Sequence, residues 1–227
     1  MYKLFSELEK YKIITILRGF SIEEIIHTTN ALYEGGIRFI EVTFDQKNSD
    51  SYTGQAISYL RRSFPSIHIG AGTVITENQL KTAYSSGAEF IISPNINPEI
   101  IKKTKSYGLL SIPGALTPSE IITAYDAGAD IVKLFPSDTL GLPYLQAIMA
   151  PINHIPLAAV GGISLNNISD FIQSGVTCVG IGSNIANSDA IHSGQYHIIK
   201  ELAQAYVDKI SAISNIKRGI PNELSLL

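Results

Sequence analysis

The sequence predicts a (β/α)8 barrel, an α/β fold of eight parallel strands that alternate with helices. The first observation is a repeat: helical stretches that end in glycine recur, each followed within one or two residues by a β-branched run. The second is spacing. The glycines lie about 20 residues apart, or about twice that where a copy is degraded, which is the size of one αβ unit. The third is length, because 227 residues can form one barrel domain.

Each repeat places its glycine where a helix ends and a strand begins, as expected of a helix C-terminal cap. The clear copies are residues 32–40, 83–91, 124–132 and 171–179, with a weaker copy at 106–110. Strands placed by this rule number eight, at about 13–17, 37–43, 67–71, 89–93, 109–112, 130–135, 157–160 and 177–181.

Helix starts fall between these strands. Ser21, Thr76 and Thr117 each begin a capping box with Glu or Gln three residues later. Ser164 is the first residue of a fourth expected helix, whose start is polar. Eight βα units favour a closed barrel over a doubly wound sheet. No linker or low-complexity segment divides the chain, so we expect one barrel domain over residues 1–212 and a C-terminal tail over 213–227.

Composition restricts the class of partner. A net charge of -3, with no long Lys/Arg run, argues against nucleic acid as a partner. The first residues are partly acidic, and nowhere do 18 uncharged apolar residues follow one another. We therefore expect a cytoplasmic protein with no membrane partner.

The chain has one cysteine, Cys178, inside an apolar run, which excludes an internal disulfide and indicates a small core residue. Its five histidines are scattered without metal-ligand spacing. We expect neither a metal ion nor another cofactor.

Lys133 stands alone in a buried apolar strand that Pro136 ends. Such a lysine is costly unless it is paired, or unless desolvation lowers its pKa until the neutral amine persists near pH 7. A neutral amine can attack a ketone and form a Schiff base. The alternative is a strand-end lysine whose ammonium group reaches water.

Glu41 lies near the end of the second strand, opposite the sixth strand that carries Lys133. Side chains of alternate strands share layers inside a barrel, so both can point into one central volume. The period of two places Ile131 and Phe135 on the same face as Lys133. The pair is either a buried salt bridge or an amine with a glutamate that transfers protons beside it.

Two glycine-rich strand ends indicate a phosphate site. Gly161 and Gly162 open a helix after the seventh strand, and Gly182 and Ser183 open one after the eighth. Glycine permits close backbone approach, and helix N-termini bind anions. The sequence therefore predicts a phosphorylated small molecule as the substrate.

Further residues at strand ends complete the candidate site. Arg18 and Thr73 can hold a carboxylate or carbonyl near the lysine, although Arg18 can also be a salt-bridge residue of the barrel mouth. Pro94 and Phe135 end the fourth and sixth strands, and we expect them to contact the substrate.

These segments together resemble the 2-dehydro-3-deoxy-phosphogluconate aldolases and their galactonate relatives, class I aldolases of sugar-acid breakdown. The similarity runs from about residue 11 to 210 and is carried by Ile16-Leu17-Arg18-Gly19, Glu41-Val42-Thr43, Gly70-Ala71-Gly72-Thr73-Val74, Ser93-Pro94-Asn95, Ile112-Pro113-Gly114, Val132-Lys133-Leu134-Phe135-Pro136 and Gly161-Gly162-Ile163.

The resemblance implies that Lys133 forms the Schiff base and that Glu41 accepts and donates protons. It further implies a homotrimer, with Arg18 and Thr73 at the pyruvyl end of the substrate and Gly161, Gly162 and Ser183 at the phosphate. Asp45 stands where the gluconate branch has arginine, and Val160 where that branch has threonine. An acidic Asp45 is unfavourable near an anionic substrate unless it points away or is paired.

The expected function is that of a Schiff-base aldolase, which cleaves a 2-keto-3-deoxy-6-phospho sugar acid of the gluconate or galactonate type. The products are pyruvate and glyceraldehyde 3-phosphate. Alternatives are a 4-hydroxy-2-oxoglutarate aldolase, a phosphate-binding barrel isomerase or epimerase, and an inactive ligand-binding relative.

Overall fold

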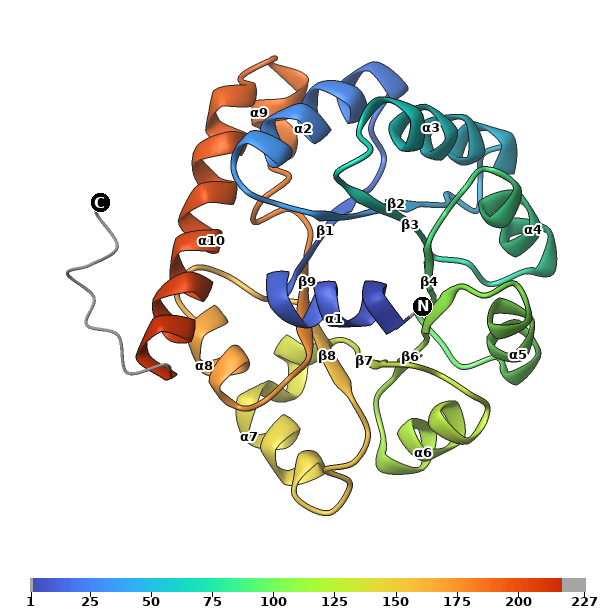
Figure 1. Ribbon diagram of the computed structural model, residues 1–227, viewed down its shortest axis with the longest axis vertical. Coiled ribbons are helices and arrows are strands. Elements are labelled where there is room, and N and C mark those ends of the chain that lie inside the picture. Colours follow the sequence, from blue (N-terminus) through green and yellow to red (C-terminus); the bar gives the residue numbers. More distant parts are fainter. Residues whose placement is uncertain (1, 218–227) are drawn as a thin grey trace.

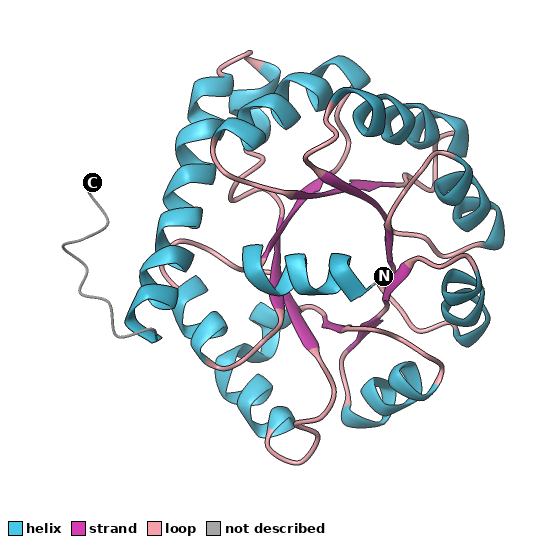
Figure 2. Cartoon of the chain, viewed as in Figure 1, coloured by secondary structure: helices cyan, strands magenta, loops and turns pink. Residues whose placement is uncertain are grey.

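The computed structural model describes residues 2–217, in which the strands form one parallel sheet that curls into a ring (Figures 1 and 2). The neighbour order is β5-β4-β3-β2-β1-β9-β8-β7-β6. The strands are β1 (Ile13–Leu17), β2 (Phe39–Thr43), β3 (His68–Gly72), β4 (Phe90–Ile92), β5 (Leu110–Ile112), β6 (Gly114–Ala115), β7 (Val132–Leu134), β8 (Leu157–Val160) and β9 (Cys178–Ile181).

β5 corresponds to the strand expected at 109–112, and β6 is a short strand beyond it that the sequence did not predict. Pro113, which has no backbone N–H to donate, separates the two. The ring closes at this point. The carbonyl oxygen of Ser111 accepts hydrogen bonds from the backbone N–H groups of Asp130 (3.0 Å) and Ile131 (3.3 Å), and that of Pro113 accepts from the N–H of Lys133 (2.8 Å). The predicted eight-unit barrel is confirmed, with strand ends that differ from the expected ones by a few residues.

Helices surround the barrel, as the alternating pattern predicts (Figure 2). The capping boxes at Ser21, Thr76 and Thr117 are all present, each with its Glu or Gln side chain bonded back to the cap backbone. The helices are α1 (Tyr2–Tyr11), α2 (Ile22–Glu34), α3 (Asp50–Ser63), α4 (Glu77–Ser85), α5 (Pro98–Ser106), α6 (Pro118–Asp126), α7 (Ser137–Met149), α8 (Ile168–Gln173), α9 (Ser188–His192) and α10 (Tyr196–Lys217).

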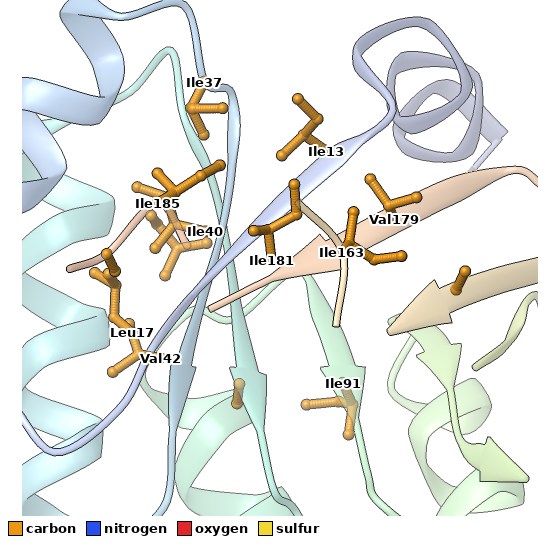
Figure 3. Packing of buried hydrophobic residues seen from close by; sticks show 14 of the residues in the cluster. Ile13, Leu17, Ile37, Ile40, Val42, Ile91, Ile163, Val179, Ile181 and Ile185 are labelled. Atoms are coloured by element: carbon orange, nitrogen blue, oxygen red, sulfur yellow. The ribbon is translucent and has the colours of Figure 1, made fainter. Parts of the chain in front are cut away.

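The buried apolar side chains form two clusters. The larger one lies between the strands and the outer helices and includes Leu17, Ile40 and Val179 (Figure 3). The smaller one contains Phe39 and Ile131, which lie two residues before Glu41 and Lys133 respectively. Residues two apart in a strand share a face, so this smaller cluster lies on the same side of the sheet as Glu41 and Lys133, in the barrel interior.

Helix α1 lies across the centre of the barrel in Figure 1. Its Leu8 is fully buried in the interior cluster, with Leu4 and Phe5 packed beside it. The side chain of Glu7 also reaches His68, at the first residue of β3. Because strands begin at this end of the barrel, α1 closes the N-terminal end and leaves the C-terminal end open to solvent.

None of the helices within residues 2–217 combines the length and apolar character needed to cross a membrane. α10 continues to Lys217, past the domain boundary expected at residue 212. The rest of the expected tail, residues 218–227, lies outside the described part of the chain, and the boundary stays a prediction.

Candidate functional site

Lys133 is the middle residue of β7, and its side chain is buried in the barrel, with the whole residue 6% exposed. Small residues flank it on both sides: Gly114 is its partner on β6 and Ala158 its partner on β8. They leave room for a long side chain inside the ring. The ammonium nitrogen Nζ lies 4.6 Å from the centre of the Phe135 ring. Phe135, by contrast, is 38% exposed and lies at the open end.

Glu41 lies on β2 and is 3% exposed. Its strand neighbours are Ile16 on β1 and Gly70 on β3. The Glu41 carboxylate occupies the space next to Gly72, because a β-carbon on Gly72 would lie 1.7 Å from Glu41 Oε1. Gly72 thus makes space for an acidic side chain inside the barrel.

Glu41 and Lys133 influence each other's charge. Burial raises the pKa of Glu41, and the positive charges of Lys133 and Arg18 oppose that rise. Burial also lowers the pKa of Lys133, with Glu41 opposing the shift and Arg18 adding to it. Desolvation therefore favours the neutral forms of both groups. Within residues 2–217 the pair forms no ion pair within 4.0 Å, so the buried salt bridge considered from the sequence is not present.

Arg18 follows β1 and meets Thr73, which follows β3. The guanidinium nitrogen Nη2 donates a hydrogen bond to Thr73 Oγ1 at 3.3 Å. Arg18 is exposed and makes no ion pair with any carboxylate in the described residues, contrary to the salt-bridge alternative. Its positive charge opposes the rise in the pKa of Glu41 and adds to the lowering of the pKa of Lys133.

A cavity of about 390 Å³ opens at the strand ends β1, β8 and β9. Six predicted residues line it: Arg18, Phe135, Gly161, Gly162, Gly182 and Ser183. Lys133, Glu41 and Thr73 are not part of its wall, but each interacts with a residue that is. Pro94 lies elsewhere on the rim, with its carbonyl group close against Gly114.

The segment after β8 differs from the expectation. Gly161 (φ 105°) and Gly162 (φ 66°) adopt left-handed backbone conformations, which a right-handed helix does not contain. A turn follows them, and α8 begins only at Ile168. Asn167 holds the turn: its Oδ1 accepts from Ser164 N (2.8 Å) and its Nδ2 donates to Gly162 O (2.9 Å). The site here is a glycine loop, not a helix N-terminus.

The segment after β9 also forms a turn, because the carbonyl oxygen of Gly182 accepts from Ile185 N (3.0 Å) and Ala186 N (2.9 Å). α9 begins later, at Ser188. Sequence reasoning missed Asn184, whose Nδ2 donates to Ile163 O at 2.6 Å and ties the two glycine loops together. Only its position directly after Gly182 and Ser183 could have indicated it.

Asp45 turns toward its own loop. Its carboxylate accepts hydrogen bonds from the backbone N–H of Lys47 (2.9 Å) and from Nδ2 of Asn48 (2.9 Å). The condition set by the sequence, that this acid be paired or point away from an anionic substrate, is therefore met by local bonds.

Cys178 is fully buried in the barrel interior, as expected, and burial raises the pKa of its thiol to about 12. In residues 2–217 no three His, Cys, Asp or Glu side chains are grouped so that they could hold a metal ion.

Comparison with known proteins gives a consistent result. Residues 4–202 match the family described as "Aldolase: KDPG and KHG aldolase". The 2-dehydro-3-deoxy-phosphogluconate aldolase of Treponema pallidum is 30% identical over 205 residues, which is 90% of this chain and 96% of the relative. The 2-dehydro-3-deoxy-6-phosphogalactonate aldolase of Escherichia coli K12 is 32% identical over 177 residues, 78% of this chain and 85% of the relative.

Among solved structures, the KDPG aldolase of Legionella pneumophila is 30% identical and superposes with a TM-score of 0.81, covering 88% of this chain and 96% of the other. That structure holds pyruvate captured at low pH as a covalent carbinolamine intermediate. The family match, the curated relatives and the superposed barrel agree, and the chain belongs to the KDPG and KHG aldolase family of class I aldolases.

Proposed function

We propose that this aldolase cleaves a 2-keto-3-deoxy-6-phospho sugar acid, of the phosphogluconate or phosphogalactonate type, to pyruvate and glyceraldehyde 3-phosphate. The observation that carries the proposal is Lys133, a buried amine whose pKa burial lowers, beside the buried acid Glu41. An amine that loses its proton readily is the nucleophile that a ketone substrate requires.

In the first half of the reaction, Lys133 Nζ adds to the C2 carbonyl carbon and forms a carbinolamine. Glu41, whose pKa burial raises, donates a proton to the departing hydroxyl group, and water leaves. The product is an iminium cation on Lys133, with Glu41 now a carboxylate near it. The Legionella relative with its pyruvate carbinolamine supports this route.

In the second half, the Glu41 carboxylate takes the proton of the C4 hydroxyl, directly or through a water molecule. The C3–C4 bond breaks, and its electron pair moves toward the iminium nitrogen to give an enamine. Glyceraldehyde 3-phosphate leaves. Glu41 returns the proton to C3, and water then hydrolyses the imine, which releases pyruvate and restores the amine.

The cavity provides for both ends of such a substrate. Arg18 and Thr73 hold the carboxylate next to the carbonyl through charge-assisted hydrogen bonds. The glycine loops, with Ser183, bind the phosphate through backbone N–H groups, because glycines leave the backbone open to close approach. Phe135 packs against Lys133, and Pro94 contacts the substrate from the loop that follows β4.

A second candidate is cleavage of 4-hydroxy-2-oxoglutarate, since a relative named KHG/KDPG aldolase in Escherichia coli K12 is 33% identical over 189 residues. The cavity lined by Gly161, Gly162 and Ser183 favours the phosphorylated substrate instead. Membership of an aldolase family disfavours the isomerase and epimerase alternatives. We further propose a homotrimer, by analogy with the family, which the molar mass in solution would test.

The first experiment is to treat the protein with pyruvate and borohydride and to measure its mass. We expect one stable pyruvyl adduct on Lys133, which Lys133→Ala abolishes and Lys209→Ala, at an exposed lysine of α10, retains. Absence of an adduct on the unmodified chain would rule out the imine route. Chelating agents should leave the adduct yield unchanged.

The second experiment compares cleavage rates for the gluconate and galactonate epimers and for 4-hydroxy-2-oxoglutarate. We expect the phosphorylated acids to have the higher kcat/KM. Gly162→Ala should selectively weaken them, because a β-carbon at Gly162 would lie 2.2 Å from Asp138 Cβ and the loop must shift. If 4-hydroxy-2-oxoglutarate were cleaved fastest, the phosphate assignment would be wrong.

A further inference from the structure

Thr73 has an unusual backbone conformation at the edge of the site. Its φ of 57° lies in the left-handed region, where a β-branched residue is a genuine outlier. Strain of this kind persists only when the surrounding structure holds it. The hydroxyl of Thr73 accepts the hydrogen bond from Arg18, so the strained conformation sets where both groups lie.

Gln79 supplies the first part of that support from the start of α4, where it is 3% exposed. Its Oε1 accepts two backbone hydrogen bonds, from Ile75 N (2.9 Å) and Thr76 N (3.2 Å). Because an amide oxygen only accepts and an amide nitrogen only donates, this fixes which way the side chain is turned. Its Nε2 must face the other way, and it donates to Gln46 Oε1 at 2.9 Å.

Gln46 supplies the second part from the loop after β2. With its oxygen occupied by Gln79, its Nε2 faces Thr73 and donates to the Thr73 carbonyl oxygen at 3.2 Å. The neighbouring Asp45 folds this loop through its bonds to Lys47 and Asn48. The two amides thus form a chain from the α4 cap to the backbone of Thr73, with only one orientation allowed for each.

We propose that Gln46 and Gln79 are positioning residues of the aldolase: their two side-chain amides hold Thr73 in its left-handed conformation and so place the Thr73 hydroxyl and the Arg18 guanidinium for the substrate carboxylate. This inference rests on the proposed function, in which Thr73 and Arg18 bind that carboxylate. It also gives the loop that begins at Asp45 a role in substrate binding without any contact between Asp45 and substrate.

The sharpest variant is Gln79→Glu. A carboxylate there still accepts the two backbone bonds of the α4 cap, but it replaces the donor nitrogen with a second acceptor. Gln46 must then turn its nitrogen to the introduced carboxylate, which places its oxygen against the Thr73 carbonyl and breaks that bond. We expect KM for the phosphorylated keto acid to rise about tenfold, with kcat changed less than about threefold and Tm retained.

Gln55→Glu is the matched control. Gln55 is an exposed residue of α3, outside this chain of hydrogen bonds, and the substitution makes the same change in charge. We expect no change in KM. Gln46→Glu should reproduce the effect of Gln79→Glu, because it presents only acceptors to the Thr73 carbonyl.

A double-mutant cycle separates positioning from a simple helix-cap role. In a Thr73→Ala background the hydroxyl is gone, so Gln79→Glu should raise KM by much less than it does in the unmodified protein. An equal rise in both backgrounds, or no rise in either, would overturn the inference. If the unmodified chain forms the borohydride-stable adduct but Gln79→Glu leaves KM unchanged, this inference is wrong and the proposed function stands. If the unmodified chain forms no adduct, the proposed function is wrong.

Discussion

The carboxylate of Glu41 lies in the space beside Gly72 that any other residue would fill, with Oε1 only 1.7 Å from the position of a β-carbon. Gly72 therefore determines where the Glu41 carboxylate can lie, because the absence of a β-carbon at Gly72 leaves room for it. In a closed barrel, one strand can provide a functional group only if its neighbour leaves room for it.

Gly72→Ala should therefore displace Glu41. We expect kcat for aldol cleavage to fall by about 10²–10⁴, the range for loss of a general acid/base, with the far-UV circular dichroism unchanged. Glu41→Gln should give a similar loss, and the double variant should lose little more, because both changes remove the same group. Near-normal turnover in Gly72→Ala would show that Glu41 is not the proton carrier.

Lys133→Met should stabilise the fold while abolishing activity. Burial lowers the pKa of Lys133 in the folded state below its ordinary value of 10.5. As the pH falls below 10.5, the lysine of the unfolded chain takes up a proton, whereas the buried amine of the folded chain stays neutral, so the free energy of unfolding decreases. The decrease ends when the pH passes below the folded pKa, and the loss of stability remains at lower pH. Methionine removes the penalty.

The measurement is Tm between pH 7 and pH 10. The variant should melt higher at pH 7, by about 2–4 °C for each kcal/mol recovered, and the gap should narrow toward pH 10. Lys209→Met, on the exposed side of α10, should not change Tm with this pH dependence. A Lys133→Met protein that melts lower at pH 7 would contradict the direction of the shift.

His68 should make stability depend on pH through its links to α1 and to neighbouring strands. Burial lowers the pKa of His68, but Glu89 and Glu7 together outweigh it and raise the pKa above 6.5; Arg61 in turn pairs with Glu89. A raised pKa means that the stabilisation is complete below pH 6.5 and is lost as pH rises through the folded value.

Urea unfolding of the native chain and of His68→Gln between pH 5.5 and pH 9 measures this effect. We expect the native chain to exceed the variant most at the acidic end, with the difference shrinking as pH rises. Glu7→Gln should reduce the slope, because it removes one of the two carboxylates that face the imidazole. A difference that grew with pH would show that His68 is buried as a neutral ring.

Cys178 should be inert to thiol reagents in the folded protein. Burial raises the pKa of its thiol to about 12, so almost no thiolate exists at pH 8, and the barrel interior excludes the reagent. We expect no labelling of the native chain over an hour by an aromatic disulfide reagent, and one equivalent in denaturant. Rapid labelling without denaturant would mean that the interior opens readily.

Much of the site was visible in the sequence because its signals are local. A lysine alone in an apolar strand and a glutamate at a strand end follow from side-chain alternation, and four-residue capping boxes follow from hydrogen bonds between near neighbours. The prediction that Gly161 and Gly162 open a helix was wrong for a related reason. Glycine composition does not reveal φ, and both residues took left-handed conformations that end a strand without starting a helix.

The sequence alone determined the alternation of strands and helices, the eight units, and the residue types that face the barrel centre, since each follows from periodicity within a few residues. Tertiary structure decided that α1 closes the N-terminal end of the barrel, that the Asp45 carboxylate bonds within its own loop, and that Gln46 contacts Gln79, 33 residues away. Such contacts have no periodic signal, because α1 and the two glutamines meet partners far along the chain, and Asp45 bonds to Lys47 and Asn48 within an irregular loop.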